Sequence, residues 1–306
     1  MTPDEYYRDA TKRNIGIVSR AEQDVLRGAR VGIVGMGGAG GIYLTTLVRM
    51  GIGRFHISDF DTFSVVNINR QAGAMSSTIG RPKAEVMAEI TRDIHPGVEV
   101  VSFDRGVGEH NIDDFLRGVD VVLDGIDVYA QPARLLLYRR AREAGIPVLF
   151  GAPLGLSGTV GAFVPGGMRY EDYFDLHEGL SPFETMIRFI VGLAPQGRHW
   201  SYMRPEDVQP DEHAGSSSAA AISLITGMVC TETLVALLKR RPLRAAPEFT
   251  QYDPYLGIFR HGRLRWGNRG PLQRLKLRFI ASKFADKIET FNHTGFQPMP
   301  GTAPDA

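Results

Sequence analysis

A glycine-rich turn that directly follows a short apolar run constrains the fold of this 306-residue chain more than any other feature. The run, 31–34, is typical of a strand buried in a parallel sheet. Within the turn, Gly35 permits a sharp bend, and Gly40 lets the following helix pack closely against the sheet. Gly37 and Gly38 leave room for a phosphate at the helix N-terminus, where unpaired N–H groups favour anions. The turn therefore predicts a nucleotide-binding strand–turn–helix unit.

The segment after the turn adds candidate ligands for the rest of a nucleotide. A helix is expected over 41–50 and a strand over 55–58, which places Asp59 at the carboxyl end of that strand. An acidic side chain at this point usually accepts hydrogen bonds from a ribose hydroxyl. The glycine spacing fits NAD as well as ATP. Arg70 and Lys83 favour ATP, because attack on its α-phosphate builds negative charge that cations must stabilise.

An acidic pair follows the next buried strand, expected over 120–123. Asp127 lies beyond its carboxyl end, where open α/β sheets bind ligands. The part played by Asp124 stays open.

Each of these polar residues also has a plain alternative. Asp59 and Asp61 could end a strand in a polar turn, and Arg70 and Lys83 could be solvated surface residues. Their occurrence together favours the interpretation as a binding site.

Together these motifs resemble the ThiF/MoeB/HesA family of adenylyltransferases, which are relatives of the ubiquitin-activating enzymes. The resemblance covers roughly residues 13–153 and rests on the ordered blocks 35–40, 59–62, 67–71, 80–83 and 123–127. It implies an enzyme that binds ATP and Mg²⁺ and transfers AMP to a carboxylate, commonly the C-terminal Gly-Gly of a small ubiquitin-like protein.

The resemblance also implies residue roles by position. The nucleotide-binding set is Gly35, Gly37, Gly38, Gly40, Asp59, Asp61, Asn67, Arg70 and Lys83, and the catalytic set is Arg70, Lys83, Asp127 and Arg13. Asp127 is expected to hold Mg²⁺ or its waters. The chain departs from the family at Val128, where an Asn is common, so one hydrogen bond to the nucleotide is missing or comes from elsewhere.

The family's arginine-bearing lead-in implies a homodimer in which Arg13 reaches into the partner's ATP site. A surface position for Arg13 is the alternative, and Arg8 or Arg20 could take its place.

The single cysteine, Cys230, bears on the mechanism because some relatives form a thioester after adenylation. It lies inside the apolar segment 219–238 with no adjacent cation to lower its thiol pKa, so we expect adenylation without a catalytic cysteine. One cysteine also excludes a multi-cysteine site, so no structural zinc is expected. The same segment contains polar residues that would be costly in lipid, and it predicts a core helix with no membrane association.

Alternating strand and helix patterns predict an α/β fold of Rossmann-like type, with a mostly parallel sheet covered by helices on both faces. The stretch 155–164 predicts an extension by antiparallel strands. The aromatic-rich stretch that follows fits a crossover lid over the substrate or a small helical subdomain with its own core. The expected divisions are an N-terminal helical arm (1–30), an ATP-binding core (31–165), a crossover/lid region with the core helix (166–258) and a basic segment with a disordered tail (259–306).

A formal net charge of +1 gives no reason to expect nucleic acid as the main partner. The basic residues of 260–283 nevertheless leave open RNA or an acidic carrier protein, beside the simpler alternative of a solvated strand and helix. The polar, acidic N-terminus lacks the pattern of a signal peptide, so a cytoplasmic location is expected.

The function expected from these observations is ATP-dependent activation of a carboxylate as an acyl-adenylate. The carboxylate could belong to a ubiquitin-like or sulfur-carrier protein, a peptide or a small acid. Two alternatives stay open: an enzyme similar to the tRNA threonylcarbamoyladenosine dehydratases, and an NAD-binding oxidoreductase or inactive scaffold.

Overall fold

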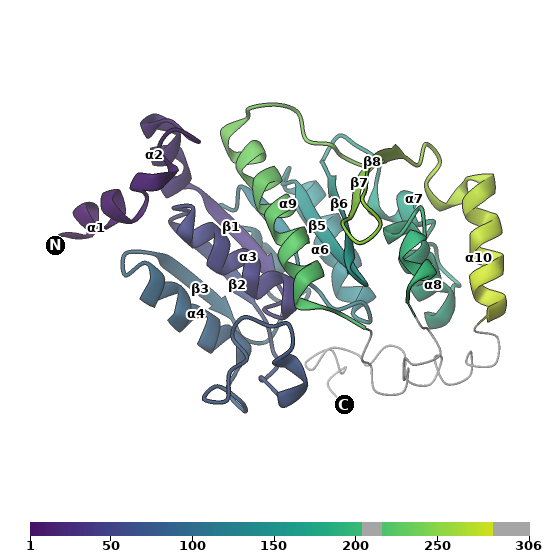
Figure 1. Ribbon diagram of the computed structural model, residues 1–306, viewed down its shortest axis with the longest axis horizontal. Helices are drawn as coiled ribbons and strands as arrows, with labels where there is room; N and C mark the ends of the chain where they lie inside the picture. The colour runs from purple at the N-terminus through teal and green to yellow at the C-terminus, as the bar shows by residue number, and fades with distance from the viewer. Residues whose placement is uncertain (204–215, 284–306) are drawn as a thin grey trace.

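The computed structural model describes residues 1–203 and 216–283, and this part of the chain contains an eight-stranded sheet with the order β3-β2-β1-β4-β5-β6-β7-β8 (Figure 1). The strands are β1 (Arg30–Val34), β2 (Arg54–Ser58), β3 (Glu99–Phe103), β4 (Val121–Asp124), β5 (Val148–Leu154), β6 (Ser157–Phe163), β7 (Glu248–Asp253) and β8 (Ile258–Arg263). Strands β1 to β5 pair in parallel, and β5 to β8 pair antiparallel. The predicted fold class is confirmed.

Helices cover both faces of this sheet because successive strand residues point in opposite directions. On one face, Ile33 and Leu123 pack with α3 (Gly38–Arg49), α4 (Lys83–Ile94) and α9 (Ala219–Leu238). On the other face, Val34 and Val122 pack with α5 (Ile112–Leu116), α6 (Gln131–Glu143), α7 (Tyr170–Phe174) and α8 (Pro182–Leu193). The remaining described helices are α1 (Pro3–Ala10), η1 (Lys12–Asn14), α2 (Arg20–Gly28), η2 (Val65–Asn67), η3 (Arg198–Ser201), η6 (Gly267–Arg269) and α10 (Pro271–Lys283).

The order of the strands reverses direction at β1. From β1 the chain proceeds to β2 and β3 on one side, and it then returns to place β4 on the other side of β1. Such a reversal leaves a crevice beyond the carboxyl ends of the two central strands, which is where open α/β sheets bind ligands.

Two element boundaries differ from expectation in ways that matter for the site. Helix α3 begins at Gly38 and not at residue 41, since Gly37 already serves as the N-cap and the turn leads directly into the helix. Strand β4 includes Asp124, so this residue is part of the sheet and Asp127 lies in the loop beyond it.

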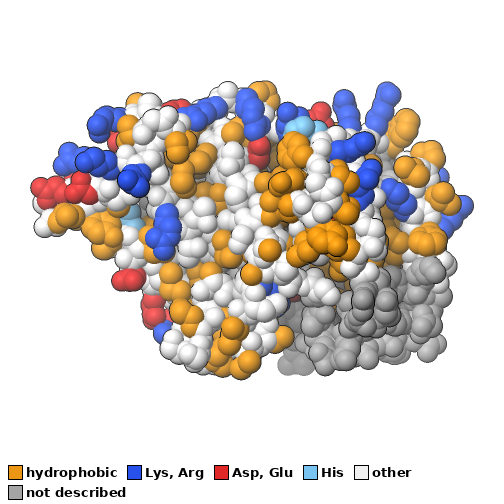
Figure 2. All heavy atoms as spheres, viewed as in Figure 1, with side chains coloured by type: hydrophobic (Ala, Val, Ile, Leu, Met, Phe, Trp, Pro, Cys, Tyr) orange, Lys and Arg blue, Asp and Glu red, His pale blue; other side chains and the backbone are white. Residues whose placement is uncertain are grey.

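The C-terminal half extends the same sheet. The boundary expected after residue 258 falls inside β8, which pairs along its length with β7. Basic side chains gather over β8 and the start of α10 at the upper right of Figure 2, and Arg260, Arg263, Arg265 and Arg274 are exposed. The predicted disorder of the tail concerns residues outside the described part.

Helix α9 is long and apolar enough to pass for a membrane span by length and composition, but it packs into the core. Ile225 is fully buried, and Gly151 and Gly158 leave room for it: a Cβ on Gly158 would lie 2.2 Å from Ile225 Cγ2. The prediction of a core helix is confirmed.

Replacing Ile225 with Ala should lower the free energy of unfolding by about 2–5 kcal/mol, because it empties a fully buried site between α9 and the sheet. Thr231→Ala, on the exposed face of the same helix, should change it by less than about 0.5 kcal/mol. Urea unfolding measures the free energy of unfolding of both variants. A loss for Ile225→Ala as small as that for Thr231→Ala would contradict the packing of α9.

Candidate active site

A cavity of about 500 Å³ opens at the carboxyl ends of β1 and β4, where the strand order reverses. Eight of the predicted site residues line it: Gly35, Gly37, Gly38, Asp59, Asp61, Arg70, Lys83 and Asp127. The structure thus brings together, from five separate segments, most of the residues that the sequence singled out. Gly40, Asn67 and Arg13 are not among the lining residues.

The glycine turn closes against the loop after β4 because two positions carry no Cβ. Gly35 has φ +89°, and a Cβ there would lie 2.2 Å from the carbonyl oxygen of Gly125. A Cβ on Gly40 would lie 1.7 Å from the carbonyl oxygen of Gly35. Gly40 therefore acts through packing, as its position predicts, while Gly37 and Gly38 face the cavity.

Asp59, which directly follows β2, connects the glycine turn to the end of that strand through hydrogen bonds. Its carboxylate accepts a hydrogen bond from the backbone N–H of Met36 at 2.6 Å and another from that of Asp61 at 2.8 Å. Burial raises the pKa of Asp59, and the positive charge of Lys83 works in the opposite direction. Each carboxylate oxygen can accept a second hydrogen bond, so the arrangement leaves capacity for the predicted ribose hydroxyl.

Two cations line the cavity beside the turn. Lys83, at the start of α4, is 6% exposed, and its Nζ lies 3.0 Å from Oδ2 of Asp61, whose side chain is about half exposed. Arg70 donates to two neutral acceptors, the carbonyl oxygen of Val66 at 3.2 Å and Oδ1 of Asn69 at 2.9 Å. Among the described residues, Arg70 forms no ion pair, so its charge is available to an anion.

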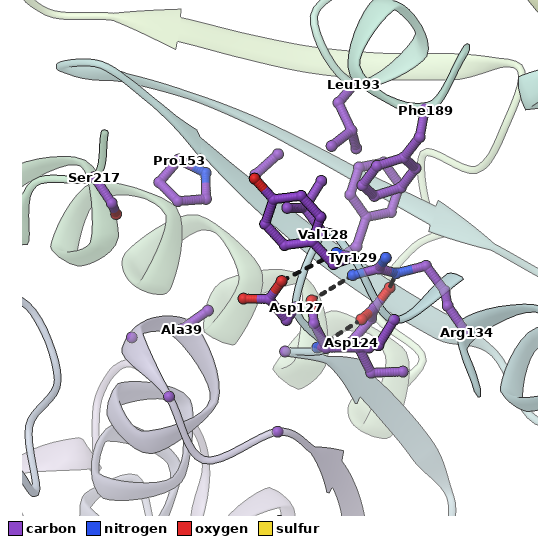
Figure 3. A pocket seen from close by; sticks show the side chains of 18 of the residues that line it. Ala39, Asp124, Asp127, Val128, Tyr129, Arg134, Pro153, Phe189, Leu193 and Ser217 are labelled. Atoms are coloured by element: carbon purple, nitrogen blue, oxygen red, sulfur yellow. Dashed lines mark hydrogen bonds and ion pairs between the residues drawn. The ribbon is translucent and has the colours of Figure 1, made fainter. Parts of the chain in front are cut away.

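The two aspartates near the end of β4 have different surroundings (Figure 3). Asp124 is buried and accepts from Arg134 Nε at 2.8 Å, from the Tyr138 hydroxyl at 2.9 Å and from the Ile126 N–H at 2.9 Å. Asp124 and Arg134 form an ion pair with side chains only 5% and 4% exposed. The structure thus gives Asp124 an architectural role, which the sequence had left open.

Asp127 is exposed, and one of its carboxylate oxygens accepts from the Tyr129 N–H at 3.0 Å. In the part of the chain that the structure describes, its other oxygen has no hydrogen-bond partner, and no group of three or more His, Cys, Asp or Glu side chains could hold a metal. Mg²⁺ is commonly bound through one or two carboxylates together with water and substrate phosphates. A single accessible carboxylate across from the glycine turn fits that manner of binding, and a metal site built from protein ligands alone does not.

Besides Gly40, two predicted residues do not line the cavity. Asn67 is buried, and its Oδ1 accepts from the backbone N–H of Ser64 at 3.0 Å and from the Ser64 hydroxyl at 3.2 Å, which caps η2. Arg13 is exposed on η1, within the N-terminal arm at the left of Figure 1. The roles assigned to both by resemblance stay predictions.

Sequence reasoning missed Arg134, which also donates to the carbonyl oxygen of Ile126 and so shapes the loop that carries Asp127. The available signal was an arginine on the same helix face as Leu137, Tyr138 and Ala141. The phenyl ring of Phe189 lies 4.5 Å from its Cζ and covers it.

The aromatic-rich stretch after residue 166 packs against the sheet and also lines the cavity. Tyr170, Tyr173 and Phe174 pack into the main core, and Phe183 belongs to a smaller cluster around α8. Tyr170 and Phe174 also line the cavity, together with further apolar side chains from this region: Met186, Ile187, Phe189, Ile190, Leu193, Trp200 and Met203. The region is therefore a small helical layer that also forms one wall of the cavity.

Cys230 is buried in α9 and does not line the cavity. Burial raises the pKa of its thiol to about 12. The thiol is therefore protonated at neutral pH, in agreement with the expectation of chemistry without a catalytic cysteine.

Replacing Asp124 with Asn should destabilise the fold by about 3–5 kcal/mol, because it leaves the Arg134 guanidinium buried without its counter-charge. Asp127→Asn should change stability by less than about 0.5 kcal/mol, since the side chain is exposed and an amide oxygen can still accept from Tyr129. Urea unfolding of both variants gives the comparison, and a larger loss for Asp127→Asn would overturn these assignments.

Known proteins resemble this chain both in sequence and in fold. The ThiF family model matches residues 11–269. The chain is similar to a tRNA threonylcarbamoyladenosine dehydratase of Haemophilus influenzae, at 39% identity over 42% of this chain and 49% of that protein. It is also similar to the SAMP-activating enzyme E1 of Haloferax volcanii (34%, 50% and 56%) and to the sulfur carrier protein adenylyltransferase of Thermus thermophilus (32%, 52% and 57%). The matches thus span about half the length of these curated relatives.

Solved structures share the fold at lower identity. The Escherichia coli tRNA N6-threonylcarbamoyladenosine dehydratase TcdA, crystallised with AMP, has a TM-score of 0.59 at 19% identity and covers 78% of this chain and 98% of its own. The structure of PaaA has a TM-score of 0.60 at 18% identity, with 79% of this chain and 66% of its own covered.

Proposed function

The chain belongs to the ThiF family, and on that premise we propose that it is an ATP-dependent adenylyltransferase that activates a substrate carboxylate as an acyl-adenylate. The observation that carries the proposal is the position of Arg70 and Lys83 beside the glycine turn and across from the exposed Asp127, all on one cavity. An NAD-binding site has the same glycine turn. It has no need of cations beside the phosphates for catalysis, because its reaction does not take place at phosphorus.

The proposed reaction is an attack by a carboxylate oxygen of the substrate on the α-phosphorus of ATP. A bond forms between that oxygen and phosphorus, and the bond from phosphorus to the bridging oxygen breaks, so that pyrophosphate leaves with the electron pair. Arg70 and Lys83 would stabilise the negative charge on the phosphate oxygens, because preorganised cations in a partly dry site need little reorganisation during the reaction. Asp59 would hold the ribose and thereby orient the α-phosphate.

Mg²⁺, held through Asp127, would supply further neutralisation of the phosphates. A homodimer in which Arg13 reaches the partner's cavity is part of the proposal. Its support is the exposure of Arg13 and of the apolar side chains of Val65 and Val66, which are 71% and 63% exposed.

A second candidate function is dehydration of threonylcarbamoyladenosine in tRNA, favoured by the 39% identity to the Haemophilus influenzae dehydratase. The same cavity would then activate a carboxylate carried by RNA. ATP turnover that depends on this tRNA and falls steeply with salt concentration would select this candidate, whereas turnover with carboxylates in the absence of RNA would select the first.

ATP–pyrophosphate exchange tests the assigned residues. Lys83→Met and Asp127→Asn should each lower the exchange rate by about 10²-fold or more, because each removes a group that interacts with the charged phosphates. Lys12→Met and Asp104→Asn, exposed and outside the cavity, serve as matched controls and should keep the wild-type rate. Exchange that survives in both site variants would remove these residues from the site, and NAD binding without any exchange would sink the adenylation proposal.

Nucleotide affinity should depend on pH through Asp59. The charged carboxylate is the better acceptor for ribose hydroxyls, so affinity for AMP should fall as the pH drops through the raised pKa of Asp59, above the range of an ordinary aspartate. The effect on stability has the opposite sign, because a raised folded-state pKa means that protonation favours the folded protein. Calorimetric titration of the wild type and Asp59→Asn with AMP separates this effect from titration of the nucleotide. If the ratio of the wild-type affinity for AMP to that of Asp59→Asn stays constant with pH, Asp59 is not the ribose ligand.

A further inference from the structure

We propose that the apolar end of the cavity is an acyl chamber that receives a bulky apolar or aromatic side chain next to the activated carboxylate. The acyl chamber is defined by Pro153, Leu154, Ile190, Leu193, Trp200 and Met203. This inference rests on the proposed adenylation and names the class of its substrate.

The cavity has two chemically different ends. Apart from Arg134 of α6, which is paired with Asp124, its charged side chains come from the ends of β2 and β4, from the start of α4 and from the segment around Arg70. The acyl chamber comes from the end of β5, from α8, and from η3 with the residues after it. In Figure 3, Asp127 lies between Ala39 of the glycine-turn helix and the side chains of Phe189 and Leu193. A carboxylate that reaches the α-phosphate at the charged end would therefore direct the rest of its molecule into the acyl chamber.

The acyl chamber has apolar surface to cover. Ile190, Leu193 and Trp200 are only partly buried, although each lines the cavity, so they present apolar area to whatever occupies it. Phe189 and Met186 also line the cavity and are almost fully buried. An apolar side chain would remove that area from water, which is the usual source of affinity in such pockets. A substrate that ends in glycine has no side chain at this point and would leave the apolar surface of the acyl chamber exposed to water.

The charges near the acyl chamber argue against an acidic side chain. The Cζ of Arg134 lies 4.5 Å from the centroid of the Phe189 ring, but this guanidinium is already neutralised by Asp124 and covered by the phenyl ring. His199 packs on Trp200 with ring centroids 5.0 Å apart, and burial lowers the pKa of His199 to about 4, so it carries no charge at neutral pH. Among the described residues that line the acyl chamber, none therefore offers an acidic group a counter-charge.

Stable analogues of the acyl-adenylate test this inference by direct binding. N-Acetyl-phenylalanyl, N-acetyl-glycyl and N-acetyl-glutamyl 5′-sulfamoyladenosines differ only in the side chain next to the acyl group, and calorimetry gives each dissociation constant. The phenylalanyl analogue should bind at least about tenfold more tightly than the other two, the discrimination expected when a side chain fills an apolar pocket.

Leu193→Gln should reduce the preference for the phenylalanyl analogue to less than about threefold while leaving the affinity for AMP unchanged. Leu243→Gln, a partly buried leucine outside the cavity, is the matched control and should keep the full preference. If Leu193→Gln fails to fold, the wild-type preference alone decides.

The outcomes separate the two levels of the proposal. Equal or tighter binding of the glycyl analogue would overturn the acyl chamber and leave adenylation standing. Failure of all three analogues to bind or to compete with ATP would overturn adenylation itself, and the acyl chamber with it.

Discussion

The close approach of the glycine turn to the loop after β4 is the constraint on which the rest of the site depends. The carbonyl oxygens of Gly35 and Gly125 occupy the space that side chains on Gly40 and Gly35 would need. This contact places the N-terminus of α3 beside the carboxyl end of β4. The anion-binding end of the helix and the loop that carries Asp127 therefore face one cavity.

Acidic residues at this edge of the sheet divide between buried structural positions and positions open to the cavity. Asp124 is consumed by a buried ion pair and two further hydrogen bonds, and Arg134 in turn fixes the carbonyl oxygen of Ile126. Asp127, three positions further on, is left exposed by the loop that this network shapes. Asp59 occupies both kinds of position, since it binds the glycine turn through Met36 and also lines the cavity. Catalytic geometry here would rest on a rigid frame built from the same residue types.

Local patterns in the sequence predicted the fold class and most of the charged end of the site. Gly35, Asp59 and Lys83 belong to motifs whose spacing is set by the strand–turn–helix unit, so their convergence follows from the topology. The apolar wall could not be predicted in this way. Whether Phe174, Phe183 or Leu193 faces the core or the cavity depends on how α7 and α8 pack, which no short motif encodes. The ion pair between Asp124 and Arg134 could not be predicted for the same reason. It joins the end of a strand to the following helix, so it depends on how that helix packs.

The identity of the products of ATP cleavage tests the central claim most directly. Phosphorus NMR can follow ATP in the presence of the protein, Mg²⁺, a panel of N-acylated amino acids and hydroxylamine, which intercepts activated acyl groups. The account predicts AMP and pyrophosphate together with a hydroxamate, formed only when a suitable carboxylate is present. Formation of ADP and phosphate would contradict it, because cleavage would then occur at the γ-phosphate and not at the α-phosphorus, which is the proposed position of attack beside the glycine turn, Arg70 and Lys83.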